Sequence, residues 1–473
     1  MPAPAKDRPL HFSAFVMNTP SHVIHGLWRD PAAANHEINS LKHWVDLASF
    51  LDSAGFDLMF FADVIGLRSP WNGSYQLVTR EGMQIPTNDP SVLISALAAA
   101  TTNIGLVYTS SIVQSQPFDF ARRISTLDHY TGGRVGWNIV TSFSDNTYRN
   151  FGHDKLIEHD QRYAIAEEYV DVTYKLWEGS WDEDALVVDK AAGVHADATK
   201  IHKINHVGEH YSVEGPHFVA PSPQRVPFLF QAGSSPVGQR FSARNAEGVF
   251  ISSPDPAAAK VLIDETRSLA AGYGRDPYDV KFFQGLSLVV GRTSEEAHER
   301  EAKMEELVSL EGVLSHMLGD AGIDAGALPL DTPLSELGEF RGIQGFKRAA
   351  DDASADPTIA DLGRAFERAS RIVGSPTEIA DRLEEWRDAG IDGVNVFHAT
   401  RPGTFEDIAE LLFPELRRRG LLGTDKSGSL RHKLSGTGDR VPSTHPAAKY
   451  RGAFTDNSLA DKVSEPLTLP AKV

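Results

Sequence analysis

The sequence predicts a (β/α)8 barrel, a TIM barrel, that carries large insertions. Eight short apolar runs recur along the chain, and a segment with helical features follows each of them. No internal repeat is present beyond this alternation. A barrel needs about 250 residues, whereas the chain has 473, so much of it must lie in insertions and a tail. A doubly wound open sheet is the alternative fold.

The strands are expected where apolar residues run without interruption between turn-forming residues. They are, in order, Leu10–Met17, Asp57–Ala62, Ile104–Ser110, Val135–Val140, Pro227–Gln231, Val249–Ser252, Phe282–Val290 and Gly393–Phe397. Helices are expected at residues 41–54, from Asp89 and Pro90 onward, and at 118–130, 161–177 and 405–419. Capping boxes at residues 293–296 and 375–378 mark two further helix starts.

Composition shifts divide the chain into a barrel domain, residues 1–422, and a C-terminal arm, residues 423–473. Within the barrel, residues 178–224 form a polar insertion rich in His and Asp. In a second insertion, residues 305–369, Gly, Asp and Pro interrupt weak helices. The arm is rich in Ser, Thr, Pro and Lys. We expect it to stay disordered or to wrap a neighbouring subunit.

The bulk composition excludes several classes of function. A net charge of −18 argues against a nucleic-acid or anionic-membrane surface. No apolar run approaches the roughly 20 residues of a membrane span, and the first ten residues lack the apolar centre of a signal peptide. A cytoplasmic protein is therefore expected. With no cysteine, thiolate metal sites and cysteine nucleophiles are excluded, and redox chemistry requires a cofactor.

Metal and dinucleotide sites are not predicted. His202, His206 and His210 are spaced four apart, with His195 nearby, which could place imidazoles on one helix face. Glycine and β-branched residues among them favour a strand or hairpin instead, and no second-shell pattern supports a metal. No GxGxxG motif follows the first strand, and neither a P-loop nor a GxSxG motif is present.

The stretch TGGRVGWNIVTSFSDNTYRNFGHDKLIEHDQRY, residues 131–163, carries the richest signal. A buried strand passes into a long polar loop, the arrangement in which active sites are built on a β/α scaffold. His159 and Tyr163 lie four residues apart at the start of the next helix and can share one face. For His159, a cap or surface position is the alternative.

The turn QAGSSPVG, residues 231–238, follows the fifth strand and opens a helix. Ser235 suits the N-cap and Pro236 the first helical position. Free backbone amides beside Ser234 and Ser235 form a site that a phosphate can occupy. An ordinary capped turn is the alternative, because caps are much commoner than anion sites.

Other polar residues end neighbouring strands on the catalytic face of a barrel. Asp63 follows the second strand, Thr109 ends the third, and Asn138 lies near the end of the fourth. The Asn138 amide offers both a hydrogen-bond donor and an acceptor to the edge of a bound ring. For Asp63 a turn cap, and for Asn138 a satisfied core position, are the alternatives.

A substrate pocket is expected near the loop HGLWRD, residues 25–30, which follows the first strand. Its candidate lining residues are His25, Trp28, Met17, Asn18, Phe61, Phe143, Phe283 and Phe397, although such aromatic sets are more often core. His316, in the second insertion, is a candidate catalytic or lid residue, with a surface histidine as the alternative. We assign His25, Phe143 and His316 as candidate catalytic residues. No Arg or Lys cluster accompanies the strand ends, so the pocket is expected to be apolar.

Several motifs together resemble one enzyme group: AD after the second strand, RVGWNIVTS, EHDQRY, QAGSSP, and the insertion from WDEDALVVDK to its GP. Over residues 10–435 the chain is similar to the two-component, reduced-FMN-dependent monooxygenases of the bacterial luciferase superfamily. The branch includes nitrilotriacetate, EDTA, dimethyl sulfide and dibenzothiophene sulfone monooxygenases. Where that group has P-Y-H-x-A-R, this chain has PFDFAR at residues 117–122, so no role is transferred from that histidine.

The resemblance implies an FMN site and its residues. Ser235, with Ser234 beside it, would bind the FMN phosphate. His159 and Tyr163 would contact the phosphate and ribose. Asp63 and Thr109 would lie beside the flavin ring.

The resemblance also implies the reaction and its partners. A separate NAD(P)H:flavin reductase would supply reduced FMN, and O2 would be the co-substrate. The substrate would be a small apolar organosulfur, aromatic or halogenated xenobiotic. We expect residues 305–369 to form a mobile lid and the chain to form a homodimer or homotetramer. A deazaflavin- or FMN-dependent oxidoreductase on the same barrel, and a non-catalytic flavin-binding protein, remain open.

Overall fold

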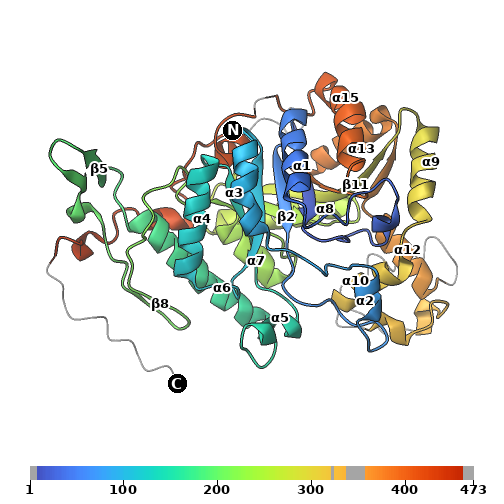
Figure 1. The fold of residues 1–473 in the computed structure, drawn as a ribbon, viewed down its shortest axis with the longest axis horizontal. Helices are drawn as coiled ribbons and strands as arrows, with labels where there is room; N and C mark the ends of the chain where they lie inside the picture. The colour runs from blue at the N-terminus through green and yellow to red at the C-terminus, as the bar shows by residue number, and fades with distance from the viewer. Residues whose placement is uncertain (1–7, 321–323, 337–356, 425, 462–473) are drawn as a thin grey trace.

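The computed structural model describes residues 8–320, 324–336, 357–424 and 426–461. In that part of the chain, eight parallel strands form a closed barrel (Figure 1). They are β1 (His11–Met17), β2 (Leu58–Ala62), β3 (Gly105–Ser111), β4 (Val135–Val140), β9 (Phe228–Gln231), β10 (Gly248–Ile251), β11 (Lys281–Val290) and β13 (Gly393–Phe397). Pairing of β10 with β11 closes the sheet, so the predicted barrel is confirmed and the open-sheet alternative is wrong.

Alternate side chains of each strand point into the barrel and out toward the helices. In β4, Trp137 packs outward against Tyr169 and Trp177, while Asn138 faces inward and binds Thr109 of β3. Aromatic and aliphatic side chains fill the interior: Phe15, Leu58, Phe60, Val107, Phe228, Phe230, Phe283, Phe397, Leu430 and Leu434. The interior is therefore a packed core, and the loops at its carboxyl end must supply the site.

Helices surround the barrel where the sequence predicts them. Their bounds are α1 (Leu41–Ala54), α3 (Pro90–Ala100), α4 (Pro117–Thr131), α6 (His159–Tyr174), α7 (Pro236–Asn245), α8 (Pro256–Gly272), α9 (Ser294–Glu305), α13 (Pro376–Ala389), α14 (Thr404–Asp407) and α15 (Phe413–Arg418). Asp89 caps α3, and Ser375 forms the predicted capping box with Glu378. None of the helices that the structure describes is long and apolar enough to cross a membrane.

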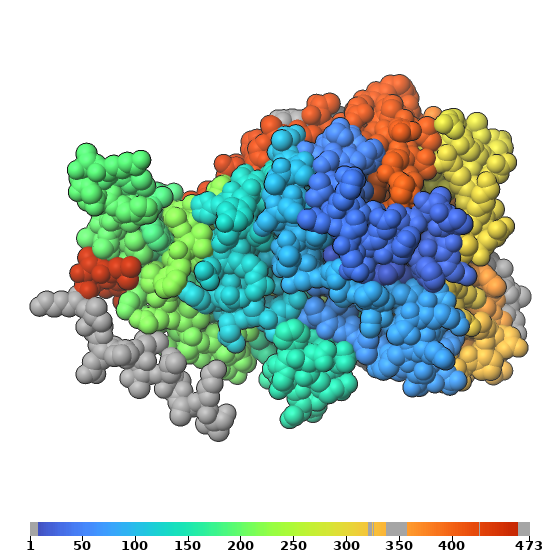
Figure 2. Space-filling view, in the orientation of Figure 1, coloured from blue at the N-terminus to red at the C-terminus, as the bar shows by residue number. Residues whose placement is uncertain are grey.

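The first insertion forms two hairpins. Strands β5 (Leu186–Asp189) and β6 (Val194–Ala196) pair in one, and β7 (His206–Val207) and β8 (Ser212–Val213) in the other. This confirms the hairpin interpretation of the histidine-rich segment, and among the described residues no group of three or more metal-ligating side chains occurs. The β5–β6 hairpin projects from the body beside the C-terminal segment (Figure 2), where His202 bridges to Ser458.

The second insertion covers one side of the barrel mouth. Helices α10 (Leu310–Asp320) and α12 (Ile359–Arg368) share a small apolar cluster built around Leu314 and Leu362. Residues 321–323 and 337–356, part of the lid candidate, lie outside the described residues. A short strand, β12 (Arg371–Gly374), follows and extends the sheet beside β11.

The C-terminal segment packs on its own barrel. Helix α16 (Leu430–Ser435) places Leu430 and Leu434 in the barrel core, and the amide of Leu430 donates to Gly133 just before β4. The Arg431 side chain, 0% exposed, forms an ion pair with the buried Glu247. Within residues 426–461 the segment packs on its own barrel, and α16 fills the amino end of the barrel.

Candidate functional site: a cradle and a cavity at the barrel mouth

The starts of α6 and α7 meet at the carboxyl end of the barrel. The Ser235 hydroxyl accepts from the Gly238 amide as the N-cap of α7 and lies 3.4 Å from Nε2 of His159. The Tyr163 hydroxyl accepts from Nε2 of Gln231 at 3.2 Å. Three of the residues predicted for the phosphate site, Ser235, His159 and Tyr163, are therefore brought together, and Ser234 is exposed on the same turn.

Glycines make this turn compact. A Cβ at Gly233 would lie 2.4 Å from the Tyr163 hydroxyl, and one at Gly238 would lie 2.8 Å from it. Backbone amides at the N-terminus of a ten-residue helix attract anions. The hydroxyl of Ser235 and the imidazole of His159 flank those amides, so the residues present fit a phosphate group.

Inside the mouth, Asn138 and Thr109 form a polar pair with defined donors. Thr109 donates its hydroxyl proton to the Phe61 carbonyl and accepts from Nδ2 of Asn138, both at 2.9 Å. This fixes the orientation of the amide. Oδ1 of Asn138 is buried and has no hydrogen-bond partner among the described residues. A buried acceptor without a partner fits a donor group of a bound ring.

Asp63 lies just past β2 and lines a cavity of about 620 Å³, which Asn88, Asp89 and Gln114 also line. Burial raises the pKa of Asp63 from 3.8 to about 7, and the negative charge of Asp89 adds to this rise. Hydrogen bonds from Val64 and Gln114 oppose it only in part. Near neutral pH, Asp63 can therefore hold a proton and act as a donor.

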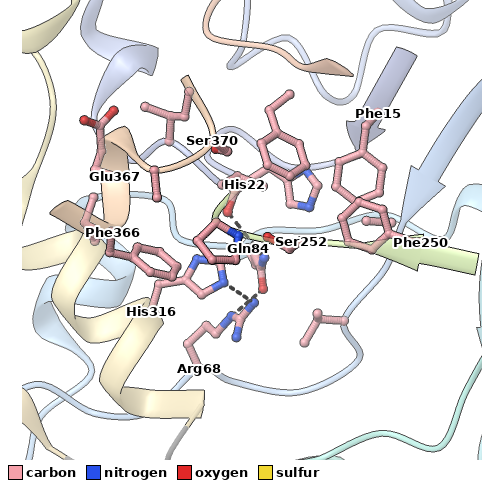
Figure 3. A pocket seen from close by; sticks show the side chains of 18 of the residues that line it. Phe15, His22, Arg68, Gln84, Phe250, Ser252, His316, Phe366, Glu367 and Ser370 are labelled. Carbon is pink, nitrogen blue, oxygen red and sulfur yellow. Dashed lines mark hydrogen bonds between the residues drawn. The ribbon is translucent and has the colours of Figure 1, made fainter. Parts of the chain in front are cut away.

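A second cavity of about 360 Å³ lies between the barrel mouth and the second insertion (Figure 3). Its apolar side includes Phe15 and Phe250, whose rings stack at 5.2 Å. Its polar side includes His22, Arg68, Gln84 and His316. Helices α10 and α12 contribute His316, Phe366 and Glu367, so the second insertion forms one wall.

The three candidate catalytic residues have different surroundings. His316 lines the cavity. His25 lies behind it, 0% exposed, with Nε2 2.8 Å from Nδ1 of His316 and Nδ1 2.7 Å from the Ser21 hydroxyl. Phe143 is 45% exposed, and its ring lies 5.3 Å from the Arg68 guanidinium. His25 is not among the residues that line the cavity, but it contacts His316, which does line it.

Burial holds both histidines neutral. It lowers the pKa of His25 to about 3 and that of His316 well below its usual value, with the positive charge of Arg68 adding to both effects. Burial also lowers the pKa of His22 strongly. Neutral imidazoles are therefore the forms present in this wall at physiological pH.

Part of the predicted cavity lining is wrong. Phe61 packs outward against Trp44, because strand alternation turns Phe60 and Ala62 of β2 inward. Phe397 lines the cavity as expected, whereas Phe283 lies in the barrel core. Of the other expected lining residues, Met17, Asn18 and Trp28 do not reach this cavity.

Three polar residues of the cavity wall were not predicted from the sequence: His22, Arg68 and Gln84. Their position in the loops that follow β1 and β2 could have identified them in the sequence, because the active sites of barrels are built from such loops. Because Arg68 is a single cation and not part of a cluster, a search for clustered charges does not find it.

Comparisons with known proteins agree with this geometry. A family model described as luciferase-like monooxygenase matches residues 22–393. The long-chain alkane monooxygenase of Geobacillus thermodenitrificans is 40% identical over 445 residues, which cover 93% of this chain and 98% of the relative. The dimethyl-sulfide monooxygenase of Hyphomicrobium sulfonivorans is 41% identical over 467 residues, 95% of each chain.

A solved structure extends this likeness to the whole fold. Riboflavin lyase, with modified FMN and its substrate riboflavin, is similar with a TM-score of 0.85 at 33% identity, covering 94% of this chain and 100% of that chain. The resemblance predicted from the motifs is thereby confirmed. The chain belongs to the luciferase-like monooxygenase family.

Proposed function

We propose that this protein is a monooxygenase that binds reduced FMN at the carboxyl end of its barrel and uses O2 to oxygenate a small organic compound. The observation that carries the proposal is the convergence of α6 and α7, where Ser235, His159 and Tyr163 surround the N-terminus of α7. The same end of the barrel holds the Asn138 acceptor and a cavity with an aromatic wall. Family membership supports the same activity.

Each residue has a distinct task in this proposal. Ser235, Ser234 and His159 hold the FMN phosphate, and Tyr163 contacts the phosphate and ribose. Asn138 accepts a hydrogen bond from the ring edge, with Thr109 fixing its amide. Reduced FMN supplies the electrons and activates O2. The apolar wall formed by Phe15, Phe250 and Phe397 excludes water from the reacting groups.

Asp63 is placed to control a proton beside the flavin ring. Its pKa of about 7 allows both the protonated and the ionised form at physiological pH. The protonated form donates a hydrogen bond, and the ionised form accepts one. We therefore assign it to hydrogen bonding at the ring and not to binding the phosphate.

The substrate class follows from the cavity. Its aromatic and aliphatic lining suits an apolar organosulfur compound or an aromatic or halogenated xenobiotic. The similarity to a dimethyl-sulfide monooxygenase supports an organosulfur substrate.

A separate NAD(P)H:flavin reductase supplies the reduced FMN, because no dinucleotide fingerprint follows the first strand. The protein acts in the cytoplasm as a homodimer or homotetramer. The apolar residues exposed on the β5–β6 hairpin, Leu186, Val187, Val188 and Val194, support self-association. Light scattering of the purified protein measures this state directly.

The test has a binding step and a turnover step. Reduced FMN is titrated anaerobically into wild-type protein and into Ser235→Ala, with Ser294→Ala, in the first turn of α9, as the matched control. Turnover is followed as oxygen uptake with FMN, NADH, a generic flavin reductase and catalase, across sulfur, nitrogen and haloaromatic compounds. A product that carries oxygen from labelled O2 supports the proposal. Absence of reduced-FMN binding by the wild type refutes it.

A further inference from the structure

Arg401 is a buried cation that no carboxylate neutralises. It follows β13 at the carboxyl end of the barrel and is 1% exposed. Among the residues that the structure describes, no Asp or Glu forms an ion pair with it, and its Nε and Nη1 have no hydrogen-bond partner. Burial lowers the pKa of Arg401 to about 9, so the guanidinium is still charged at neutral pH. The equally buried Arg431, by contrast, pairs with Glu247.

Two carbonyl groups and one ring hold this guanidinium in place. Nη2 of Arg401 donates to the carbonyl of Thr19 at 3.4 Å and to that of Asn35 at 3.2 Å. The central guanidinium carbon lies 4.6 Å from the centre of the Trp44 ring, and the face of an indole attracts a cation. Arg401 therefore joins the β13–α14 connection to α1, which carries Trp44, and to two points of the β1 loop, residues 18–40 between β1 and α1.

Backbone hydrogen bonds fasten the same two segments to each other. The amide of Ala34 donates to the carbonyl of Arg401 at 2.6 Å, and the amide of Arg401 donates to Oδ1 of Asn35 at 2.8 Å. Nδ2 of Asn35 donates in turn to the carbonyl of Ala399 at 3.1 Å. These contacts form one cluster, the Arg401 clamp, which consists of Thr19, Asn35, Trp44 and Arg401.

The β1 loop that the clamp holds builds part of the second cavity. Residues 22–24 line this cavity, and they lie only a few positions beyond Thr19. The Thr19 hydroxyl also donates to the carbonyl of Pro86 at 2.9 Å, which ties the clamp to the connection between β2 and α3, a second lining segment. The charge of Arg401 contributes to the lowered pKa of His22. The clamp thus lies directly behind the cavity wall.

A charge held in this way costs stability, which favours a functional reason for it. Taking a guanidinium out of water is unfavourable, and a carboxylate would offset that cost better than neutral carbonyls and a ring do. Replacing buried charges with apolar side chains of similar volume is often neutral or stabilising. Residues that lower stability are expected where function needs them.

We infer that Arg401 is a positioning residue for the oxygenation reaction, because its guanidinium holds the β1 loop against the β13–α14 connection and so keeps residues 22–24 in the cavity wall. This rests on the proposed monooxygenase function. Arg401 is not among the lining residues, so it acts through the loop. A wall in a fixed position excludes water from the reacting groups, and small displacements of such groups lower reaction rates.

The first measurement is hydrogen exchange of the FMN-loaded protein, followed by mass spectrometry of peptides that cover the β1 loop. In Arg401→Met these peptides are expected to exchange at least about 10-fold faster than in the wild type, because local opening no longer breaks the clamp. The midpoint of urea denaturation is expected to stay the same or to rise. A residue with only a structural role would lower this midpoint.

The second measurement needs no knowledge of the natural substrate. Protein loaded with reduced FMN is mixed with O2, and the release of hydrogen peroxide is timed. Without a substrate, O2 takes up two electrons and two protons and leaves as hydrogen peroxide, while FMN becomes oxidised. Water entry past a loosened wall should raise this rate at least about 10-fold in Arg401→Met. FMN affinity, which depends on the start of α7, should change by less than about 3-fold.

Three further variants separate positioning from a general loss of structure. Arg134→Met removes another buried arginine that donates to backbone carbonyls, just before β4 at the amino end of the barrel, and both readouts should match the wild type. Arg401→Lys keeps the charge near Trp44 without the planar fork, and it should restore part of both readouts. Asn35→Ala opens the clamp from the loop side, and it should speed exchange of the β1 loop as Arg401→Met does.

Two results overturn the inference. One is a clearly lower urea midpoint or a failure to fold in Arg401→Met, either of which marks a structural role. The other is wild-type exchange of the β1 loop and wild-type peroxide release in both Arg401→Met and Asn35→Ala. If the wild type does not bind reduced FMN, the proposed function is refuted instead, and hydrogen exchange of the protein without FMN still tests the clamp.

Discussion

The pKa of Asp63 gives a prediction about stability whose sign and size both follow from the structure. Burial, together with the charge of Asp89, raises this pKa from 3.8 to about 7. Between these two pH values the unfolded chain has lost the Asp63 proton and the native protein has kept it. The free energy of unfolding therefore falls as pH rises, by about 1.4 kcal/mol for each pH unit. Above pH 7 both states are ionised and the loss is complete.

Asp63→Asn removes this titration while keeping the size and shape of the side chain. Of the interval from pH 5.5 to 8.5, about 1.5 pH units lie below the native pKa of Asp63, and only in that part does the titration of Asp63 change the stability. The stability of the wild type should therefore decline relative to Asp63→Asn by about 2 kcal/mol over that interval. Asparagine stays neutral, so the variant is expected to be the more stable protein at pH 8.5.

Urea denaturation followed by tryptophan fluorescence measures this difference, and the chain has seven tryptophans as reporters. Comparing wild type and variant at each pH cancels the titration of every other group. Asp255→Asn, at the exposed N-cap of α8, is the matched control for loss of one carboxylate. Asp89→Asn keeps a good N-cap but removes the neighbouring charge, and it should reduce the pH effect. A wild-type-to-variant difference that stays constant from pH 5.5 to 8.5 would refute the reasoning.

Further substitutions test the candidate phosphate site at the start of α7 and the packing of α16 in the amino end of the barrel. Gly233→Ala would place a Cβ 2.4 Å from the Tyr163 hydroxyl, so FMN affinity should fall at least about 10-fold. A fluorescence titration measures this affinity, and an unchanged value would contradict phosphate binding at the start of α7. Arg431→Met leaves the buried Glu247 carboxylate without its ion-pair partner, so the free energy of unfolding should fall by about 3 to 5 kcal/mol. Urea denaturation measures this change, and a fall of less than about 1 kcal/mol would contradict the expected role of the ion pair. Leu430→Ala opens a cavity in the barrel core and should cost about 2 to 5 kcal/mol, with FMN affinity kept because α16 lies at the opposite end of the barrel.

The barrel, and the elements that carry the candidate phosphate-site residues, could be predicted from the sequence because both depend on patterns local to the chain. Apolar runs bounded by turn residues fix the strands, and caps such as Asp89 and Ser375 fix helix starts. His159 and Tyr163 are four residues apart, and Ser235 opens a helix directly after a strand. The closure of a parallel sheet brings the carboxyl ends of its strands together, so these residues come to lie close to one another.

Only the tertiary structure decided which residues line the second cavity and where the C-terminal segment packs. Arg68 and His316 are 248 residues apart, and no spacing in the sequence relates them. His25 and His22 are three residues apart in one loop, yet only His22 reaches the cavity. Leu430 and Leu434 look unremarkable in a polar tail, but they fill the amino end of the barrel. Contacts between distant segments depend on how the elements pack, and the residues that join there carry no shared local pattern.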